Sequence, residues 1–388
     1  MNTSSATEEV IEIEITAAAH GGDGVGRIAG MVCFVSGALP GDTVRARIVR
    51  RSPRAAWAEV ESVLTPSPYR ESTQACAECP GACAWRAFAY PAQADWKRRI
   101  VADSLERIGG IQTEVAWLEQ AEYRLGYRTR AVFHGDGTTI GYFVPRTHMV
   151  VPMEACPLNH ARLNDAFQRL QMPGIRGDIQ VAVNPEGQDI MVFLRDEAAA
   201  LKEHFPQTNT RLDRVRHQFM FDGVPVVNGV FSQSSLLLNR MLRAHTDACI
   251  GGAGSLLDLY CGNGNLSLHH AGSARVCGID HAGAAIRAAA SLAPGVYIEG
   301  EEAHMARLLK KQSWEVILLD PPRTGARALV EALAAARAQK IVYVSCDPAT
   351  LARDLRGIMA AGWSLTQATV VDMFPYTPHV ETVCVLEQ

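Results

Sequence analysis

Hydrophobic and polar residues alternate over short distances in the first part of the chain. Residues 11–15 and 44–50 alternate with a period of two, and residues 31–35 form an apolar run. Clusters of glycine and proline lie between these segments. Short alternating strands joined by such turns are typical of a small β-barrel. We therefore predict that residues 1–68 form a β-barrel domain.

The pattern then changes to one helix followed by further strands. Residues 90–108 carry Trp96, Ile100 and Leu105 at helical spacing, and Gly109-Gly110 follows as a stop signal. Four strand-like runs come next, at residues 127–133, 141–144, 179–183 and 190–193. We predict a central α+β domain over residues 69–222, with its first helix as a candidate to pack on the domain that follows.

From residue 223 onward, strand-like runs alternate with helical patterns. The predicted strands are residues 256–259, 275–279, 296–298, 316–319, 341–344, 369–373 and 380–386. Strands that alternate with helices predict a parallel sheet, with the last two runs as an antiparallel edge. The fold class is therefore α/β, with a Rossmann-like domain at residues 223–388.

Composition and charge exclude several classes of protein. The 388 residues are 48% hydrophobic and 20% charged, which is an ordinary globular profile. A net charge of -4 argues against binding to nucleic acid through bulk charge. It leaves room for a local basic face, which could contact phosphate or simply be solvated: Arg45, Arg47, Arg50, Arg51 and Arg54. No apolar run is long enough for a membrane span and no signal peptide is evident, so we expect a cytoplasmic protein without a membrane partner.

Three of the ten cysteines lie within eight residues of one another. Cys76, Cys79 and Cys83 form this cluster, and Cys156 could supply a fourth thiolate. Four thiolates can hold a [4Fe–4S] cluster, which we favour, and the same ligands would suit a tetrahedral zinc ion. A site without metal also remains open.

A glycine-rich turn follows the first strand of the Rossmann-like domain. Gly262 and Gly264 allow the backbone to approach a ligand closely, and Asp280 ends the next strand, eighteen positions after Gly262. That spacing is typical of a carboxylate that binds the ribose of a nucleoside cofactor. Asn265 stands where a dinucleotide-binding turn needs another small residue, which favours S-adenosylmethionine over NAD.

A cysteine lies between the predicted strand at residues 341–344 and the helix that follows. Asp347 and Pro348 are suited to the cap and the first position of that helix, so Cys346 would sit at its positive end, which favours a thiolate. Asp320 ends another strand and is either a site residue or an ordinary turn residue. Glu381 is either a solvated strand residue or a base in the same cleft.

Four segments, residues 258–266, 319–323, 344–354 and 379–382, together resemble the RNA 5-methyluridine (uracil-5-) methyltransferase family. The glycine-rich start of the chain resembles the TRAM domain, a small RNA-binding barrel with an OB-like fold. The resemblance implies a class I S-adenosylmethionine-dependent fold. It also implies that Cys346 is the nucleophile and Glu381 the general base. The residues matching those that hold cofactor or substrate are Gln233, Tyr260, Asn265, Asp280 and Asp320.

The function that this resemblance implies is methylation of carbon 5 of a uridine in RNA. The presence of both the barrel and the cysteine cluster is more similar to the 23S ribosomal RNA branch than to the transfer RNA branch, which is the alternative. A non-catalytic RNA-binding iron–sulfur assembly factor is an alternative of another class, and a nicotinamide oxidoreductase is a third. No obligatory protein partner is expected.

Overall fold

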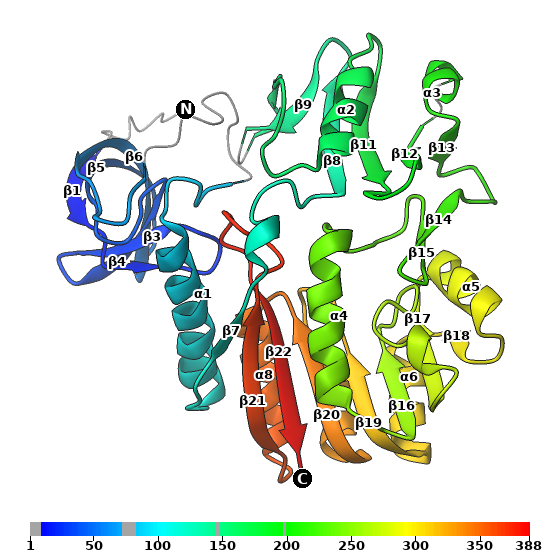
Figure 1. Cartoon of the computed structure of the whole chain (residues 1–388). Coiled ribbons are helices and arrows are strands. Elements are labelled where there is room, and N and C mark those ends of the chain that lie inside the picture. Colours follow the sequence, from blue (N-terminus) through cyan, green and yellow to red (C-terminus); the bar gives the residue numbers. More distant parts are fainter. Residues whose placement is uncertain (1–8, 72–82, 145–146, 197–198) are drawn as a thin grey trace, which may run out of the picture. The chain divides into compact units, whose positions relative to one another are not determined.

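The alternating N-terminal segments pair into one six-stranded sheet. The computed structural model describes residues 9–71, 83–144, 147–196 and 199–388 (Figure 1). The strands are β1 Val10–Glu14, β2 Ala17–Ala18, β3 Gly24–Ile28, β4 Met31–Ser36, β5 Thr43–Arg51 and β6 Ala55–Thr65, in the order β1-β5-β6-β4-β3-β2. Alternate residues such as Ile13, Val35 and Val44 form the core. The three predicted strands are confirmed. Strands β2, β3 and β6 were not predicted: β3 begins within the glycine cluster that was interpreted as a turn, and the inward positions of β6, Ala56 and Ala58, are small.

This sheet belongs to a compact unit that also includes the described residues 83–103 and 374–379. Helix α1 (Tyr90–Ser104) ends near the predicted stop and continues as one π-helical turn, η1 (Leu105–Gly109), before the left-handed Gly110. The Lys97 side chain is fully buried, and its Nζ donates a hydrogen bond to the Phe374 carbonyl oxygen at 2.9 Å. The Gln93 side-chain oxygen accepts from the Tyr376 amide at 3.0 Å. Residues 374–379, which come from late in the sequence, are therefore held by α1.

Of the described residues, the second unit contains 104–144, 147–196, 199–373 and 380–388. Its first sheet is built from β10 (Val150–Val151), β9 (Ile140–Phe143), β8 (Arg130–Asp136), β11 (Arg176–Val183), β12 (Ile190–Leu194) and β13 (Gln207–Thr210), in that order. Its pairings are antiparallel except that of β12 with β13. Helix α2 (Ala161–Arg169) packs on β11, and Phe133 and Phe167 meet in the shared core. A hairpin, β14 (Gln218–Phe221) and β15 (Val224–Val227), then leads to α4 (Leu236–Ile250).

The larger sheet of this unit carries the strand ends on which the site is built. Its strands are β18 (Tyr297–Glu299), β17 (Arg275–Asp280), β16 (Ser255–Leu259), β19 (Ser313–Leu319), β20 (Arg337–Ser345), β22 (Glu381–Glu387), β21 (Ser364–Val371) and β7 (Ala116–Leu118), in that spatial order. The first five are parallel, and β22 is antiparallel to both of its neighbours. This confirms the parallel sheet with an antiparallel edge, to which β7 adds a strand that was not predicted.

Helices connect the strands of the larger sheet. They are α5 (Gly283–Leu292), α6 (Glu302–Lys311), α7 (Val330–Ala334) and α8 (Pro348–Met359), together with the 3-10 turn η3 (Leu268–His270). Helix α4 lies in front of the sheet in Figure 1 and contacts β20. Leu351, Leu355 and Ile358 recur at helical spacing along α8 and are fully buried. Among the described residues, no helix has both the length and the apolar character needed to span a membrane.

Candidate active site

The order of the strands brings the predicted site residues to one edge of the larger sheet. Because β16, β17, β19 and β20 are parallel, their carboxyl ends meet at this edge, where Asp280, Asp320 and Cys346 follow or end their strands. Strand β22 runs in the opposite direction, so its first residue lies at the same edge. Ser345 pairs with Thr382, which places Cys346 and Glu381 beside each other although 35 positions separate them.

Cys346 lies in the two-residue connection between β20 and α8. Asp347 caps the helix as predicted, because its Oδ1 accepts hydrogen bonds from the amides of Ala349 and Thr350 at 3.1 and 2.8 Å, and Pro348 is the first helical residue. We expected the N-terminal end of α8 to lower the pKa of Cys346 and so favour the thiolate. This expectation is wrong, because the net shift of that pKa is upward. Burial raises the pKa of the Cys346 thiol to about 11, reinforced by Glu381 and Asp320 and opposed by Arg323.

Glu381 is a buried carboxyl group. Its side chain is almost completely inaccessible, and its Oε1 has no hydrogen-bond partner among the residues that the structure describes. Burial raises the pKa of Glu381 well above its usual range, the neighbouring Asp320 adds to the effect, and Arg323 opposes it. A buried oxygen without a hydrogen-bond partner lowers the stability of the folded protein unless a ligand donates a hydrogen bond to it. Glu381 therefore indicates a ligand-binding position at this edge of the sheet.

Two further carboxyl groups are buried on neighbouring strands: Asp320, whose charge reaches Cys346 and Glu381, and Asp258, whose neighbours are Asp320 and Asp280. Burial raises the pKa of Asp320 to about 7, and the charge of Asp280 adds to the effect. Burial likewise raises the pKa of Asp258 to about 8, although a hydrogen bond donated by Ser267 Oγ at 2.5 Å opposes the shift. The sequence indicated Asp258 only as part of the glycine-rich motif. Its burial beside two other acids depends on packing that no local pattern reveals.

The glycine-rich turn after β16 is held in a left-handed conformation. Tyr260, Gly262 and Gly264 have φ angles of 59°, 54° and 77°. Only the glycines adopt such angles without strain, so Tyr260 stores strain at the end of the strand. Its hydroxyl group donates to Glu302 at 2.8 Å, a partner that sequence reasoning missed. Oδ2 of Asp280 accepts a hydrogen bond from the Gly262 amide at 2.9 Å. The carboxylate predicted to bind a ribose therefore also fixes the shape of the turn.

The two amide residues predicted to hold cofactor or substrate lie at or near α4. Asn265 and Asn239 of α4 exchange two hydrogen bonds through their side-chain amides, at 2.7 and 2.9 Å. Gln233 is buried on the segment that precedes α4, whose N-cap is Ser235. The partner Asn239 could not be found from the sequence, since its spacing to Asn265 matches no local motif.

The residues at this edge fit a positively charged cofactor. Asp258, Asp280, Asp320 and Glu381 bring four acidic side chains together in buried surroundings. Because burial raises the pKa of Asp258, Asp320 and Glu381, a nearby cation would stabilise their ionised forms. The sulfonium and ammonium groups of S-adenosylmethionine would supply such a charge, whereas the pyrophosphate of NAD would be repelled by these ionised forms. Oδ1 of Asp280 accepts the Ala282 amide and also lies 3.3 Å from Nδ1 of His281, whereas Oδ2 accepts only the Gly262 amide among the described residues and keeps a lone pair for a ribose hydroxyl group.

A basic cavity opens next to the site. It measures about 840 Å³ and is lined by Glu302, Arg323, Thr324, Gly325, Arg327, Ala328, Thr350 and Arg353. Arg323 follows the two prolines after Asp320 and is the cation whose charge reaches both Cys346 and Glu381. Three arginines at the mouth of a site suit the phosphates of a nucleic acid.

An aromatic and basic surface lies on the outer face of the N-terminal sheet. Phe34 and Trp57 are cross-strand partners on β4 and β6, and their rings stack with centroids 5.8 Å apart. The guanidinium group of Arg50, on β5, lies 3.4 Å from the centre of the Trp57 ring. Arg47 and Arg51 of the predicted basic run are instead engaged with Glu61 and Glu9. The stacked rings and Arg50 form the kind of surface on which unpaired bases stack.

Two of the four predicted metal ligands, Cys76 and Cys79, lie outside the described residues. Cys83 belongs to the first unit and Cys156 to the second, and both thiols are buried. The positive charge of Arg128 acts on Cys156, and within the described part of the chain the Arg128 Nε atom is buried without a hydrogen-bond partner. A cation beside a thiol favours the thiolate that binds metal, so Cys156 and its surroundings fit the predicted cluster.

Comparisons with known proteins agree with this geometry. Residues 303–388 match the family model described as tRNA (Uracil-5-)-methyltransferase, and residues 6–60 match the TRAM domain. An uncharacterized RNA methyltransferase of Gloeobacter violaceus is 30% identical over 98% of this chain and 97% of its own length. The 23S rRNA (uracil(1939)-C(5))-methyltransferase RlmD of Hahella chejuensis is 30% identical over 98% of both chains. The solved tRNA (uracil-54, C5)-methyltransferase of Pyrococcus abyssi, in complex with S-adenosyl-L-homocysteine, shares the fold with a TM-score of 0.75, at 21% identity and over 97% of this chain and 100% of that chain.

Proposed function

This chain belongs to the RNA uracil-5 methyltransferase family and is an S-adenosylmethionine-dependent RNA methyltransferase, and from that premise we propose that it methylates carbon 5 of a uridine through a covalent bond to Cys346. The observation that carries the proposal is the register of β20 and β22. It places a thiol and a buried carboxyl group side by side at one edge of the sheet. The glycine-rich turn that follows β16 (residues 260–264), which we call the cofactor turn, lies at the same edge.

The reaction needs both groups because carbon 5 of uracil is a poor nucleophile. When Cys346 loses its proton and its sulfur bonds to carbon 6, the ring electrons form an enolate that makes carbon 5 nucleophilic. Bound S-adenosylmethionine supplies the methyl group that carbon 5 accepts. Glu381 in its ionised form, which the charge of Arg323 favours, then takes the remaining proton from carbon 5, the carbon 5–carbon 6 double bond forms again, and the sulfur leaves as thiolate.

The other residues bind and orient. Asp280, Tyr260 and Asn265 shape the glycine-rich turn, Asp320 lies at the same edge, and the acidic side chains there favour a cationic cofactor. Gln233, buried on the segment before α4, is proposed as a further binding residue. The basic cavity at Arg323 and the stacked rings of the N-terminal sheet offer contacts to phosphates and to unpaired bases. A uridine in a structured RNA must be unpaired or turned out of its stack to reach Cys346.

We propose 23S ribosomal RNA as the substrate, with transfer RNA as the alternative. The RlmD relatives, which carry a 23S rRNA name, extend over nearly the whole chain, and this supports the first choice. The solved relative of the same fold carries a tRNA name. Sequencing modified uridines in RNA from cells with and without the gene distinguishes them, because only the true target loses its methyl group.

We also propose that Cys76, Cys79, Cys83 and Cys156 hold a [4Fe–4S] cluster. The buried thiols of Cys83 and Cys156 and the charge of Arg128 support it. Anaerobically purified protein should then absorb broadly near ~400 nm and contain about four iron atoms per chain. A colourless protein with one tightly bound zinc ion would contradict the cluster and favour the zinc alternative.

The covalent step can be tested with RNA in which 5-fluorouracil replaces uracil. Fluorine at carbon 5 cannot be removed as a proton, so a stable protein–RNA adduct should accumulate when S-adenosylmethionine is present. The adduct should be absent in Cys346→Ala and present in the matched control Cys277→Ala, whose thiol lies on β17. An adduct that survives in Cys346→Ala would overturn the assignment. A protein that binds RNA and never forms an adduct would support the non-catalytic assembly factor.

A further inference from the structure

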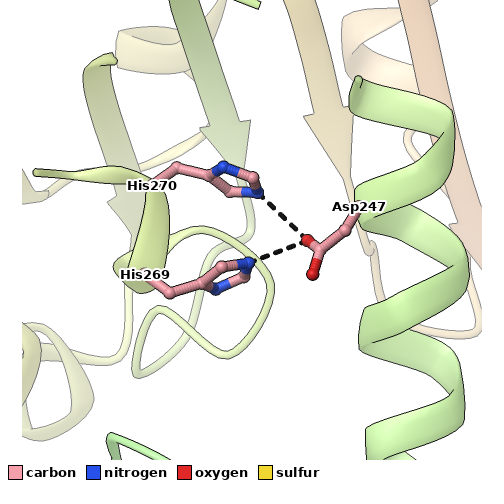
Figure 2. A group of neighbouring side chains, drawn as sticks. All are labelled: Asp247, His269 and His270. Carbon is pink, nitrogen blue, oxygen red and sulfur yellow. Dashed lines mark hydrogen bonds and ion pairs between the residues drawn. The ribbon is translucent and has the colours of Figure 1, made fainter. Parts of the chain in front are cut away.

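Two histidines and one aspartate converge on one point of the second unit, away from the strand ends described above. Asp247 lies in the last turn of α4, and His269 and His270 form the end of η3 (Figure 2). The Nε2 atoms of His269 and His270 lie 2.8 and 3.0 Å from the same carboxylate oxygen, Oδ1 of Asp247. The three potential ligand atoms all lie within 4.8 Å of one another.

The convergence is unusual because consecutive residues of a 3-10 turn point in directions about 120° apart. The two imidazole rings nevertheless lie with their centroids 4.1 Å apart and their planes at 39°. All three side chains remain partly accessible to solvent, with exposed fractions of 33%, 18% and 35% for His269, His270 and Asp247. An ion from solution can therefore reach the group.

The carboxylate group of Asp247 presents one oxygen, Oδ1, to two imidazole nitrogens. Two imidazoles and one carboxylate form a common ligand set for divalent transition metals.

We propose that Asp247, His269 and His270 bind a divalent transition-metal ion such as Zn²⁺. Zinc binds nitrogen at about 2.0–2.1 Å and carboxylate oxygen at about 2.0–2.2 Å, so tetrahedral ligand atoms lie roughly 3.4 Å apart. The observed separations of 2.8 and 3.0 Å need to widen by only about 0.5 Å, which small side-chain rotations supply. The remaining coordination positions would be filled by water.

One neighbouring cation has to move when the metal binds. Nη2 of Arg243 lies 3.3 Å from Nδ1 of His269, which therefore accepts a hydrogen bond and carries its own hydrogen on Nε2. Metal binding through Nε2 transfers that hydrogen to Nδ1. Arg243 is half-buried and already donates through Nη1 to the Asp222 carbonyl oxygen at 3.0 Å, so it keeps a partner after turning away from His269.

The consequence of the site is a cross-link between α4 and the segment that follows the cofactor turn. Asn239 and Asn265 join the same two segments through their side-chain amides. A metal at Asp247 adds a second connection between them, so its binding free energy stabilises the folded protein. This holds whether or not the proposed RNA substrate is correct.

Equilibrium dialysis of the full-length protein against Zn²⁺ tests the site. Because cysteines elsewhere also bind zinc, the quantity compared is zinc per chain between variants. The double variant His269→Ala/His270→Ala should bind one zinc ion fewer than the wild type and lose the rise in melting temperature that Zn²⁺ gives the wild type. The control His217→Ala, which removes an exposed histidine elsewhere, should match the wild type. An unchanged zinc content in the double variant would overturn the proposal.

A second measurement uses the wild type alone and does not depend on a variant that folds. Diethyl pyrocarbonate modifies accessible histidines, and mass spectrometry locates each modification. Zn²⁺ should protect His269 and His270 and leave His217 reactive. Equal modification of the pair with and without Zn²⁺ would show that the three side chains form only a hydrogen-bonded group, which contradicts the proposal.

Discussion

Removal of the positive charge of Arg323 should make Cys346 less reactive, even though the two residues are not partners in any hydrogen bond described above. The pKa of Cys346 is about 11. At pH 8, three units lower, about one thiol in a thousand is ionised, and only the thiolate reacts with an alkylating reagent. Arg323 opposes the rise in this pKa, so Arg323→Gln should raise it further and lower the thiolate fraction.

The size of the effect follows from Coulomb's law. Two unit charges about 4 Å apart interact by about 1 kcal/mol in water and by about 4 kcal/mol at an effective dielectric constant of ~20. The Arg323 side chain is exposed, so the smaller value applies. It corresponds to about 0.7 pKa unit, which means about fivefold less thiolate at any pH below the pKa.

The assay is the rate of iodoacetamide modification at Cys346, followed by mass spectrometry of its peptide between pH 7 and pH 10. The wild-type rate should rise about tenfold per pH unit over this range, because every pH in it lies below the pKa. Arg323→Gln should follow a parallel line about fivefold lower. Arg327→Gln is the matched control, since it lines the same cavity and does not act on the pKa of Cys346. Equal rates in the wild type and Arg323→Gln, or an equal loss in the control, would refute the electrostatic reasoning.

Three other substitutions test the proposed roles. Glu381→Gln should accumulate a covalent adduct on unmodified RNA, visible on a denaturing gel, because the proton on carbon 5 stays in place; full methylation activity in this variant would contradict the role. Trp57→Ala should weaken RNA binding in a filter assay by about 1–3 kcal/mol through loss of a stacking surface, whereas the exposed Tyr69→Ala should not. Gly264→Ala should cost about 1–2 kcal/mol of stability in urea unfolding and weaken cofactor binding, because its φ is 77° and the new methyl group would meet a hydroxyl at 2.9 Å; Gly272→Ala has open space and should be neutral.

The features that the sequence could predict are those set by neighbouring residues. The cap formed by Asp347 and Pro348 and the strand that precedes Cys346 depend on a few adjacent positions, and the structure confirms both. The resemblance also indicated Cys346 and Glu381 as a pair. Their proximity, however, arises because β22 is inserted between β20 and β21, a pairing that no local pattern reveals.

The features that the sequence could not predict depend on packing between distant segments. The pKa of Cys346 moved against the expected direction because burial and acids on other strands outweigh the local effect of the helix end. Arg128 and Arg130 lie in the strand-like run at residues 127–133, where a basic side chain alone would suggest an exposed face or a phosphate contact. In the structure, Arg128 buries its Nε atom, and Arg130 donates to the Gln180 side chain at 3.2 Å.

The hydrogen bonds between α1 and residues 374–379 limit how this protein can be shortened in experiments. Lys97 and Gln93 satisfy backbone groups of Phe374 and Tyr376, only a few positions before Glu381. A shortened protein that begins at residue 104 would retain every proposed catalytic side chain and still lose these two anchors. The catalytic portion should therefore not be expressed or transferred to another protein without the first hundred residues. Those residues hold the loop that leads into its last strand through these two hydrogen bonds.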